Sequence, residues 1–235
     1  MPETFFGLAG EDWRSVGLSL QVATVAVLLS LPPGLALGWV LARKEFPGKT
    51  LTEAMLNLPL VLPPVVTGYL LLLLLGRNGW VGGWLYRTLG LEIAFTWRAA
   101  VISAGVMGFP LLVRAVRLAF QGLDPRLEQA ARSLGAGPWS AFWTVSLPLA
   151  RNGVIAGIVL SFARGLGEFG ATLLFAGDSD QTRTISLAIR DLFDQPSDAA
   201  GVRLWRLVIV AVLLACAAVG ISEYLERRGR RRESA

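Results

Sequence analysis

The sequence contains no histidine and only one cysteine, Cys216, among its 235 residues. A single cysteine excludes a disulfide within one chain, and without histidine the usual ligand set of a zinc site is missing. We therefore expect no metal site and no catalytic residues. The same shortage disfavours an intramembrane enzyme, because the one cysteine has no histidine to act as its base.

Charged residues are also scarce, at 17% of the chain, and they are unevenly spaced. None occurs between Arg14 and Arg43 or between Glu53 and Arg77, and each gap exceeds the roughly 20 residues that cross a bilayer as a helix. Three further apolar runs follow. The pattern predicts an all-α integral membrane protein whose single domain, 1–235, holds about five transmembrane helices. Their expected limits are about 15–41, 54–75, 98–119, 152–176 and 204–224.

Basic residues are distributed unevenly between the two sets of loops that alternate along such a chain. Segments 42–53, 114–151 and 225–235 hold 13 of the 22 Lys and Arg residues, whereas segments 1–14, 76–98 and 177–206 hold 8. Cytoplasmic loops are enriched in Lys and Arg, so we expect the N-terminus outside and the C-terminus in the cytoplasm. The Arg-rich tail is then interpreted as an anchor on the lipid bilayer, with no nucleic acid as partner.

Prolines fall inside two of the expected spans. Pro32 and Pro33 lie in the first, and Pro59, Pro63 and Pro64 lie in the second. Proline cannot donate a backbone hydrogen bond and its ring clashes with the preceding turn, so we expect a kink or break in each span. Broken spans of this kind suggest helices packed tightly around a pathway, and the alternative is that prolines are simply more frequent in membrane helices.

The longest expected inner segment, 121–150, carries the start and stop signals of a short helix. Asp124 is a favourable N-cap, Pro125 suits the first helical position, and Glu128 stands in the first turn, where negative charge favours the helix dipole. Gly135, with a second glycine and a proline soon after it, is typical of a helix end. The segment predicts a helix of about ten residues outside the bilayer, which could act as a rigid lever if a partner bound it.

This segment resembles the cytoplasmic loop of ABC-importer permeases. The pattern of that loop is Glu-Ala-Ala, three residues, Gly, nine residues, Ile, one residue and Leu-Pro. The residues in register with it here are Ala130, Ala131, Gly135, Leu147 and Pro148. Gln129 occupies the acidic position and Glu128 precedes it by one residue, so either of the two is a candidate for the acidic role. The resemblance implies that these residues couple the chain to an ATPase.

Three other stretches are similar to the molybdate permeases of bacteria. They are Phe46-Pro47-Gly48-Lys49, the stretch 58–69 with its Leu-Pro-Leu-Val-Leu-Pro-Pro run, and the stretch 161–172. Sulfate/thiosulfate permeases share the Arg-x-x-Gly-Glu-Phe-Gly part of the last stretch, so it identifies oxyanion permeases as a group. The short chain and the run at 58–64 favour molybdate among them.

The resemblance implies a type I ABC-importer permease with a cytoplasmic coupling helix, in a bacterial inner membrane. Its expected partners are a second copy of the chain, two cytoplasmic ATP-binding subunits and an extracytoplasmic molybdate-binding protein. ATP and magnesium would belong to the partner ATPase, and this chain would bind no cofactor. Gly48-Lys49-Thr50 does not form a phosphate loop, because Arg43 stands where that motif requires its first glycine.

Two charged residues, Arg164 and Glu168, fall inside the fourth expected span. A spacing of four residues places both on one helix face. Charge at membrane depth is usually paired or functional, so the two either form a structural ion pair or border the path of the oxyanion. Ser161, Thr172 and Thr67 carry hydroxyl groups that are further candidates for that path.

Two alternative functions stay open. One is a permease for sulfate, thiosulfate or tungstate, which competition between the oxyanions would reveal. The other is a stand-alone channel or secondary transporter, whose uptake would survive the depletion of ATP. About five spans without an internal repeat count against an inverted-repeat transporter.

Overall fold

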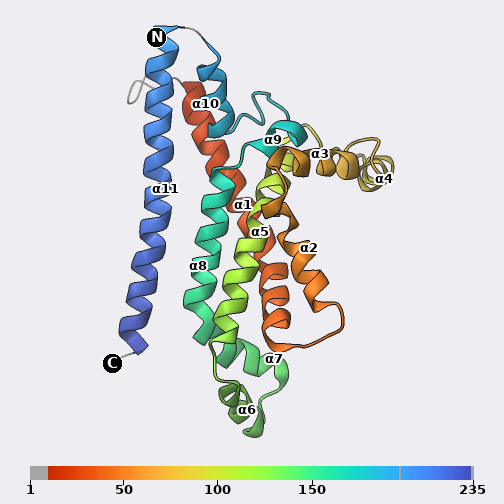
Figure 1. Ribbon diagram of the computed structural model, residues 1–235, viewed down its shortest axis with the longest axis vertical. Coiled ribbons are helices and arrows are strands. Elements are labelled where there is room, and N and C mark those ends of the chain that lie inside the picture. Colours follow the sequence, from red (N-terminus) through yellow and green to blue (C-terminus); the bar gives the residue numbers. More distant parts are fainter. Residues whose placement is uncertain (1–9, 196, 234–235) are drawn as a thin grey trace.

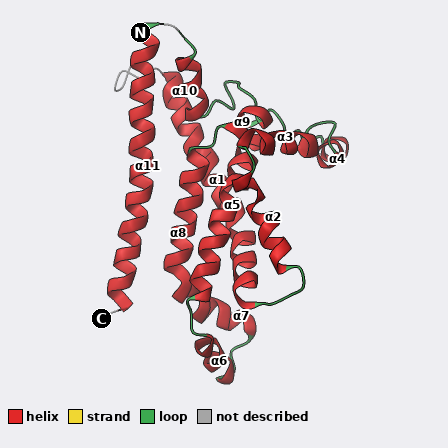
Figure 2. Ribbon diagram, viewed as in Figure 1, coloured by secondary structure: helices red, strands yellow, loops and turns green. Residues whose placement is uncertain are grey.

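The computed structural model describes residues 10–195 and 197–233, and this part of the chain contains helices and loops but no strand (Figure 2). Three long helices form its centre: α1 (Gly10–Arg43), α5 (Trp97–Gln121) and α8 (Leu147–Leu166). Figure 1 shows α11 (Asp198–Glu233) at one edge and α2 (Lys49–Val61) at the other. The described residues do not include 1–9 and 234–235. The two chain ends, whose sides of the membrane were predicted, therefore lie outside them.

Small residues bring the central helices into close contact. A Cβ atom added at Gly38 of α1 would lie 2.5 Å from the Cγ1 atom of Val116 in α5. One added at Gly153 of α8 would lie 2.5 Å from the Cβ atom of Ala119, also in α5. Helices in lipid associate through such close packing, because the hydrophobic effect does not drive them together there. The three helices therefore form a fixed frame for the rest of the chain.

The predicted fold class is confirmed. Within the described part of the chain, four helical segments are long and apolar enough to cross a membrane, and a sharply bent helix pair makes a fifth if it is counted as one span. The four are Gly10–Arg43, Trp97–Gln121, Pro138–Leu166 and Ala200–Ile221. The bent pair consists of α2 and α3 (Pro64–Leu75).

The bend shows that the second span, expected as one helix over 54–75, is two helices at an angle of 113°. Leu62 between them is extended, with φ −69° and ψ 143°, as is usual for a residue that precedes proline. Pro63 and Pro64 then supply no N–H group to the turn before them. α3 leaves the bundle sideways and, with α4 (Trp80–Leu89), forms an arm near one end of the molecule (Figure 1).

Of the kink or break expected at Pro32 and Pro33, the break is wrong, because α1 runs through both prolines as one helix. Packing against α5 accounts for this. A Cβ atom added at Gly34 would lie 2.8 Å from the Cδ2 atom of Leu112, so α1 is held against its neighbour directly after the prolines. Neighbouring helices can compensate in this way for the hydrogen bonds that proline removes.

The fourth span begins and ends earlier than the expected range 152–176. It runs from Pro138 through α7 (Pro138–Ala141), the π-helical turn η2 (Phe142–Ser146) and α8, and it ends at Leu166. Gly167 closes the last turn, and α9 (Gly170–Phe175) is a separate short helix. Pro138 starts the run because proline suits the first helical position, and Pro148 has no N–H group to donate to the preceding turn, where the π-helical turn lies.

Candidate coupling loop and intramembrane ion pair

The predicted helix of the inner segment is α6 (Pro125–Ser133), at the end of the bundle farthest from α10 (Ile185–Phe193) (Figure 1). Asp124 is its N-cap, and the Asp124 Oδ1 atom accepts a hydrogen bond from the Arg126 N–H group at 2.9 Å. The chain turns away at Gly135, whose φ of +95° lies in the left-handed region that favours glycine. No residue of α6 is buried, so the helix is available to a partner.

Glu128 attaches α6 to the start of the fourth span. The Ser146 hydroxyl donates a hydrogen bond to the Glu128 Oε2 atom at 3.2 Å, and Ser146 is buried in η2. Gln129 and Ala130 are exposed, and Ala131 is half-buried. The two candidates for the acidic position therefore differ: Glu128 contacts its own chain, and Gln129 is open to a partner.

The remaining predicted residues of this loop lie around η2. Leu147 begins α8 and is half-buried against a core that contains Phe120, and Pro148 is exposed in the first turn of the same helix. Sequence reasoning missed Phe142, whose ring lies 5.8 Å from the Phe120 ring and 6.1 Å from the Trp39 ring, measured between centroids. Its aromatic contacts fix the loop to the central helices, and the adjacent residues Phe142 and Trp143 were the only sequence signal for it.

Exposed apolar side chains surround the helix on this end of the molecule. Leu134 is 90% exposed and Trp139 is 76% exposed, and Leu127 and Trp143 are exposed as well. Large apolar side chains gathered on one surface mark a site for another protein. The loop thus offers a capped helix and an apolar border to a partner.

The opposite end of the fourth span holds the two intramembrane charges. The Arg164 Nη1 atom lies 2.7 Å from the Glu168 Oε2 atom, with 26% of the Arg164 side chain and 2% of the Glu168 side chain exposed. Glu168 stands beyond the end of α8, so the expectation that both lie on one helix face is wrong. The ion pair forms across the turn at Gly167, and the Glu168 Oε1 atom accepts the Ala171 N–H group of α9 at 2.8 Å.

The three hydroxyl candidates are buried within the chain. Ser161 packs on α5, where a Cβ atom added at Gly108 would lie 2.5 Å from the Ser161 Oγ atom. Thr172 is buried in α9, and Thr67 is buried in α3 with no hydrogen-bond partner for its hydroxyl among the described residues. Of the predicted pathway residues, Arg164 is therefore the most open in a single chain. The pathway roles of these three residues, of Arg164 and of Glu168 stay predictions.

A cavity of about 580 Å³ lies between α1, α2 and α5. Its lining is almost wholly apolar and includes Pro33, Met55, Pro59 and Phe109. An oxyanion needs polar or cationic groups, so this cavity does not suit one. Among the described residues, no group of three or more His, Cys, Asp or Glu side chains is placed to hold a metal ion.

Ion pairs concentrate around α10. The Arg183 Nε atom lies 3.3 Å from Asp178 Oδ1 and 3.2 Å from Asp191 Oδ2. Burial raises the pKa of the Asp191 carboxyl, the hydrogen bond and the charge of Asp178 raise it further, and Arg183 opposes the change. On the adjacent α11, Arg203 donates two hydrogen bonds to Asp12 of α1, at 2.9 and 3.2 Å. The Arg183 pairs tie α10 to the loop that precedes it, and the Arg203–Asp12 contact ties α11 to the start of α1.

Comparison with known proteins relates the chain to membrane components of transport systems. The family described as "Binding-protein-dependent transport system inner membrane component" matches residues 34–231. The chain is 51% identical over 226 residues to the Molybdenum transport system permease protein ModB of Escherichia coli (strain K12), which covers 96% of this chain and 98% of that one. It is 35% identical over 231 residues to the Sulfate transport system permease protein CysW of Synechocystis sp., which covers 96% and 82%.

Among solved structures, the chain is similar to one from the bacterial alginate ABC transporter in complex with its alginate pentasaccharide-bound periplasmic protein. The TM-score is 0.72 at 18% sequence identity, and the match covers 94% of this chain and 80% of the other. At such low identity the likeness concerns the fold. It extends over nearly all of the helices described above.

Proposed function

The chain belongs to the family of binding-protein-dependent transport system inner membrane components, and from this premise we propose that it is the membrane-spanning subunit of an ATP-driven importer of molybdate. Identity to a molybdenum permease over almost the full length of both chains supports the substrate. The chain is a multi-pass inner-membrane transport subunit and not an enzyme.

The exposed helix α6 is the observation that carries the coupling role. It is capped at its start, closed by a left-handed glycine and attached through Glu128 to Ser146 at the base of the fourth span. We propose that each of two cytoplasmic ATP-binding subunits holds one such helix, with Gln129, Ala130 and Leu134 at the contact. ATP and magnesium bind in those subunits. Their closure on ATP moves α6, and the spans turn from an inward-open to an outward-open arrangement.

A second copy of the chain is the proposed partner within the membrane. No residue of α2 is buried, and α3 is apolar on every side. Their exposed side chains include Met55, Leu58, Val61, Tyr69 and Leu73. A helix that is apolar all round, as α3 is, lies in a protein core or in the membrane, and we propose a second copy as the cover for α3 and for the exposed apolar side chains of α2. A homodimer would place the two broken spans around one pathway.

The end of the molecule that carries α10 is the proposed contact for an extracytoplasmic molybdate-binding protein. The distribution of Lys and Arg supports the outward position of this end, with the N-terminus outside and the C-terminus in the cytoplasm. Charged groups gather there in ion pairs, including Arg190 with Asp194 at 3.1 Å. Charged surfaces of this kind steer and select a protein partner.

Purification and uptake test the function together. The tagged chain should co-purify with an ATP-hydrolysing subunit. The reconstituted complex with its binding protein should take up labelled molybdate only when ATP is present on the side of the membrane that carries the ATP-hydrolysing subunits. Uptake that continues without ATP, driven by an ion gradient, would contradict the proposal and favour a channel or secondary transporter.

A sulfate, thiosulfate or tungstate importer is the second candidate, and the 35% identity to a sulfate permease supports keeping it. Competition separates the substrates. We expect unlabelled molybdate to suppress uptake at concentrations at which sulfate and thiosulfate have no effect. Stronger suppression by sulfate would overturn the choice of molybdate while leaving the importer class intact.

A further inference from the structure

The short helix α9 is held at both of its ends. At its start, the Glu168 Oε1 atom accepts the Ala171 N–H group at 2.8 Å while the Glu168 Oε2 atom pairs with Arg164. At its end, the Phe175 carbonyl accepts the Phe95 N–H group at 3.0 Å. A helix of six residues is not stable alone, so these contacts determine where α9 lies.

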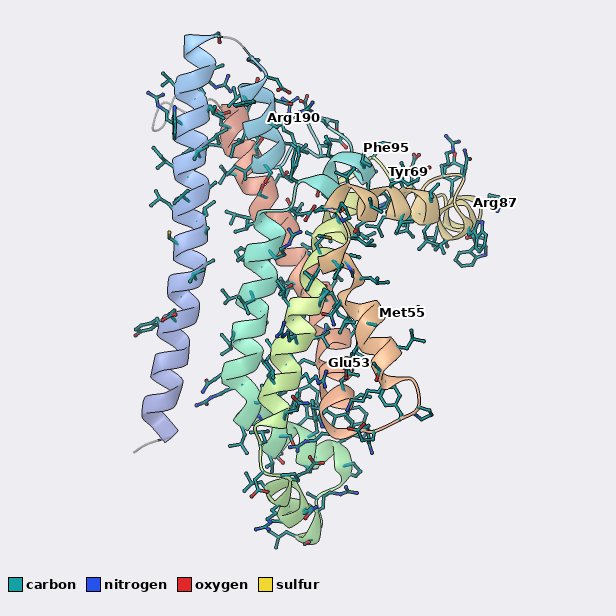
Figure 3. The ribbon with its side chains drawn as sticks, viewed as in Figure 1. Glu53, Met55, Tyr69, Arg87, Phe95 and Arg190 are labelled. Atoms are coloured by element: carbon teal, nitrogen blue, oxygen red, sulfur yellow. The ribbon has the colours of Figure 1, made fainter. Side chains whose placement is uncertain are left out.

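α9 is also joined to α3, backbone against backbone. A Cβ atom added at Gly68 of α3 would lie 2.7 Å from the Ala171 Cα and carbonyl oxygen atoms. One added at Gly170 of α9 would lie 2.8 Å from the Pro64 Cβ atom. With no side chain between the two backbones, the helices cannot slide independently without a clash. We treat α3 and α9 as one unit, the α3–α9 unit, of which Figure 3 labels Tyr69 on the exposed surface.

The fourth span connects this unit to the coupling loop. Its 29 residues, Pro138–Leu166, reach from α7 beside α6 to Arg164 in the last turn, about 40 Å at the rise of an α-helix. Beyond Leu166 the chain passes through Gly167, which alone would be a flexible joint. The Arg164–Glu168 ion pair bridges that joint from one side to the other.

We propose that the Arg164–Glu168 pair is a clamp that transmits the movement of the fourth span to the α3–α9 unit, so that Glu168 is a positioning residue and not a ligand of the oxyanion. The inference rests on the proposed function. One Glu168 oxygen pairs with Arg164 and the other accepts the Ala171 N–H group, and the side chain is only 2% exposed. A carboxylate is also negatively charged, as the transported oxyanion is, so it would repel that anion. Separating a buried pair would leave an uncompensated charge, which makes the link resistant to opening.

A double variant tests the clamp in the complete transporter. Glu168→Gln keeps a carbonyl oxygen for the Ala171 N–H group, and Arg164→Met keeps an unbranched chain without leaving a buried charge. We expect the combined variant to hydrolyse ATP at a near-normal rate while molybdate uptake falls about tenfold, with an unchanged KM for uptake. Glu45 and Lys49, 2.7 Å apart with the same spacing of four residues and with Glu45 exposed, provide the matched control as Glu45→Gln with Lys49→Met, which should leave uptake normal.

Spin labels supply a readout that a purely structural role would not change. In a Cys216→Ser background, labels at Tyr69→Cys and at the exposed Ser133→Cys report the distance between the two copies at the α3–α9 unit and at α6. ATP trapping should change both distances in the otherwise unchanged protein. In the double variant it should change only the distance at α6. If the double variant assembles poorly, Arg164→Lys serves instead, because it keeps the positive charge beside Glu168. It should reduce the distance change at the α3–α9 unit by a smaller amount and leave the change at α6 intact.

The outcomes separate the two proposals. Normal uptake by the double variant, or a normal distance change at Tyr69→Cys, would overturn the clamp while leaving the importer intact. Loss of uptake with a raised KM and a normal distance change would identify Arg164 as an oxyanion contact and also overturn the clamp. Absence of ATP-driven molybdate uptake by the unchanged complex would overturn the proposed function, and the clamp with it.

Discussion

Single glycines decide how several parts of this chain are positioned, and two of them, Gly135 and Gly38, lead to opposite kinds of test. At Gly135 the constraint is the backbone angle, since a Cβ atom added there would meet nothing within 4 Å. At Gly38 the constraint is space, since the α1 backbone there is ordinary helix and Val116 is too close. The same substitution therefore has different consequences at the two positions.

Gly135→Val should uncouple ATP hydrolysis from transport. Valine is strained by about 1–2 kcal/mol in the left-handed region, so the end of α6 should shift while the spans stay intact. Molybdate uptake per ATP hydrolysed should fall several-fold in reconstituted complexes. Gly137→Val is the control, because Gly137 has φ −67° and open space around it. Equal coupling in both variants would contradict a lever role for α6.

Gly38→Ala should destabilise the contact between α1 and α5. The added methyl group overlaps Val116, and overpacking of this kind costs about 1–3 kcal/mol. Gly17→Ala, in the same helix but with nothing within 4 Å, should instead stabilise the protein by up to about 1 kcal/mol, because alanine favours helix. Thermal unfolding in detergent measures both changes, and a stabilised Gly38→Ala variant would show that the frame is looser than described.

At the scale of elements, α10 and its ion pairs form a group whose stability should depend on pH. The raised pKa of Asp191 means that the folded chain holds this proton to a higher pH than the unfolded chain does. Its stabilising contribution is then full below the ordinary Asp pKa of about 3.9 and is lost as the pH rises through the raised value.

Asp191→Asn should remove the loss of stability that accompanies a rise in pH, because asparagine has no carboxyl group to lose a proton. The difference in unfolding temperature between variant and unchanged protein should grow in favour of the variant as the pH rises from about 4 towards neutrality. The control is Asp194→Asn, because Asp194 forms an exposed pair with Arg190. A difference that stays constant with pH would show that Asp191 titrates normally.

Much of this element structure could be predicted from the sequence because local signals determine it. Asp124, Pro125 and Gly135 define α6 through backbone chemistry alone, and charge-free stretches define the long helices. The bend after Leu62 and the continuity of α1 at Pro32 could not be predicted, since both contain proline. The outcome depends on whether a neighbouring helix compensates for the lost hydrogen bonds, and that is a tertiary contact.

For the site residues too, local signals predicted some features, whereas features that depend on tertiary contacts could not be predicted. The attraction between Arg164 and Glu168 follows from their charges, but the sequence suggested a helical pair where the chain in fact turns at Gly167. The contact of Glu128 with Ser146 joins residues 18 positions apart and left no local signal. Phe142 was missed for a similar reason, because its ring contacts belong to three different helices.

At the scale of the whole molecule, the predicted sides of the membrane can be tested with one cysteine at a time. Cys216 is the only cysteine, so Cys216→Ser gives a background without thiols. Thr88→Cys on α4 should react with a membrane-impermeant maleimide in intact cells. Ser140→Cys near α6 should react only after the membrane is opened, and both residues are exposed. The reverse pattern would invert the orientation deduced from Lys and Arg.

The bend between α2 and α3 has a consequence for water. Pro63 and Pro64 have no N–H groups, so the carbonyl groups of Pro59 and Leu60 cannot receive the hydrogen bonds that residues four positions later normally donate. A carbonyl group at membrane depth must find another donor, and at the end of α2 Val61 is 80% exposed, so little of the chain surrounds it. The two carbonyl groups therefore need a hydrogen-bond donor from outside α2, and the position of this need along the helix is fixed by two residues that cannot be protonated or phosphorylated.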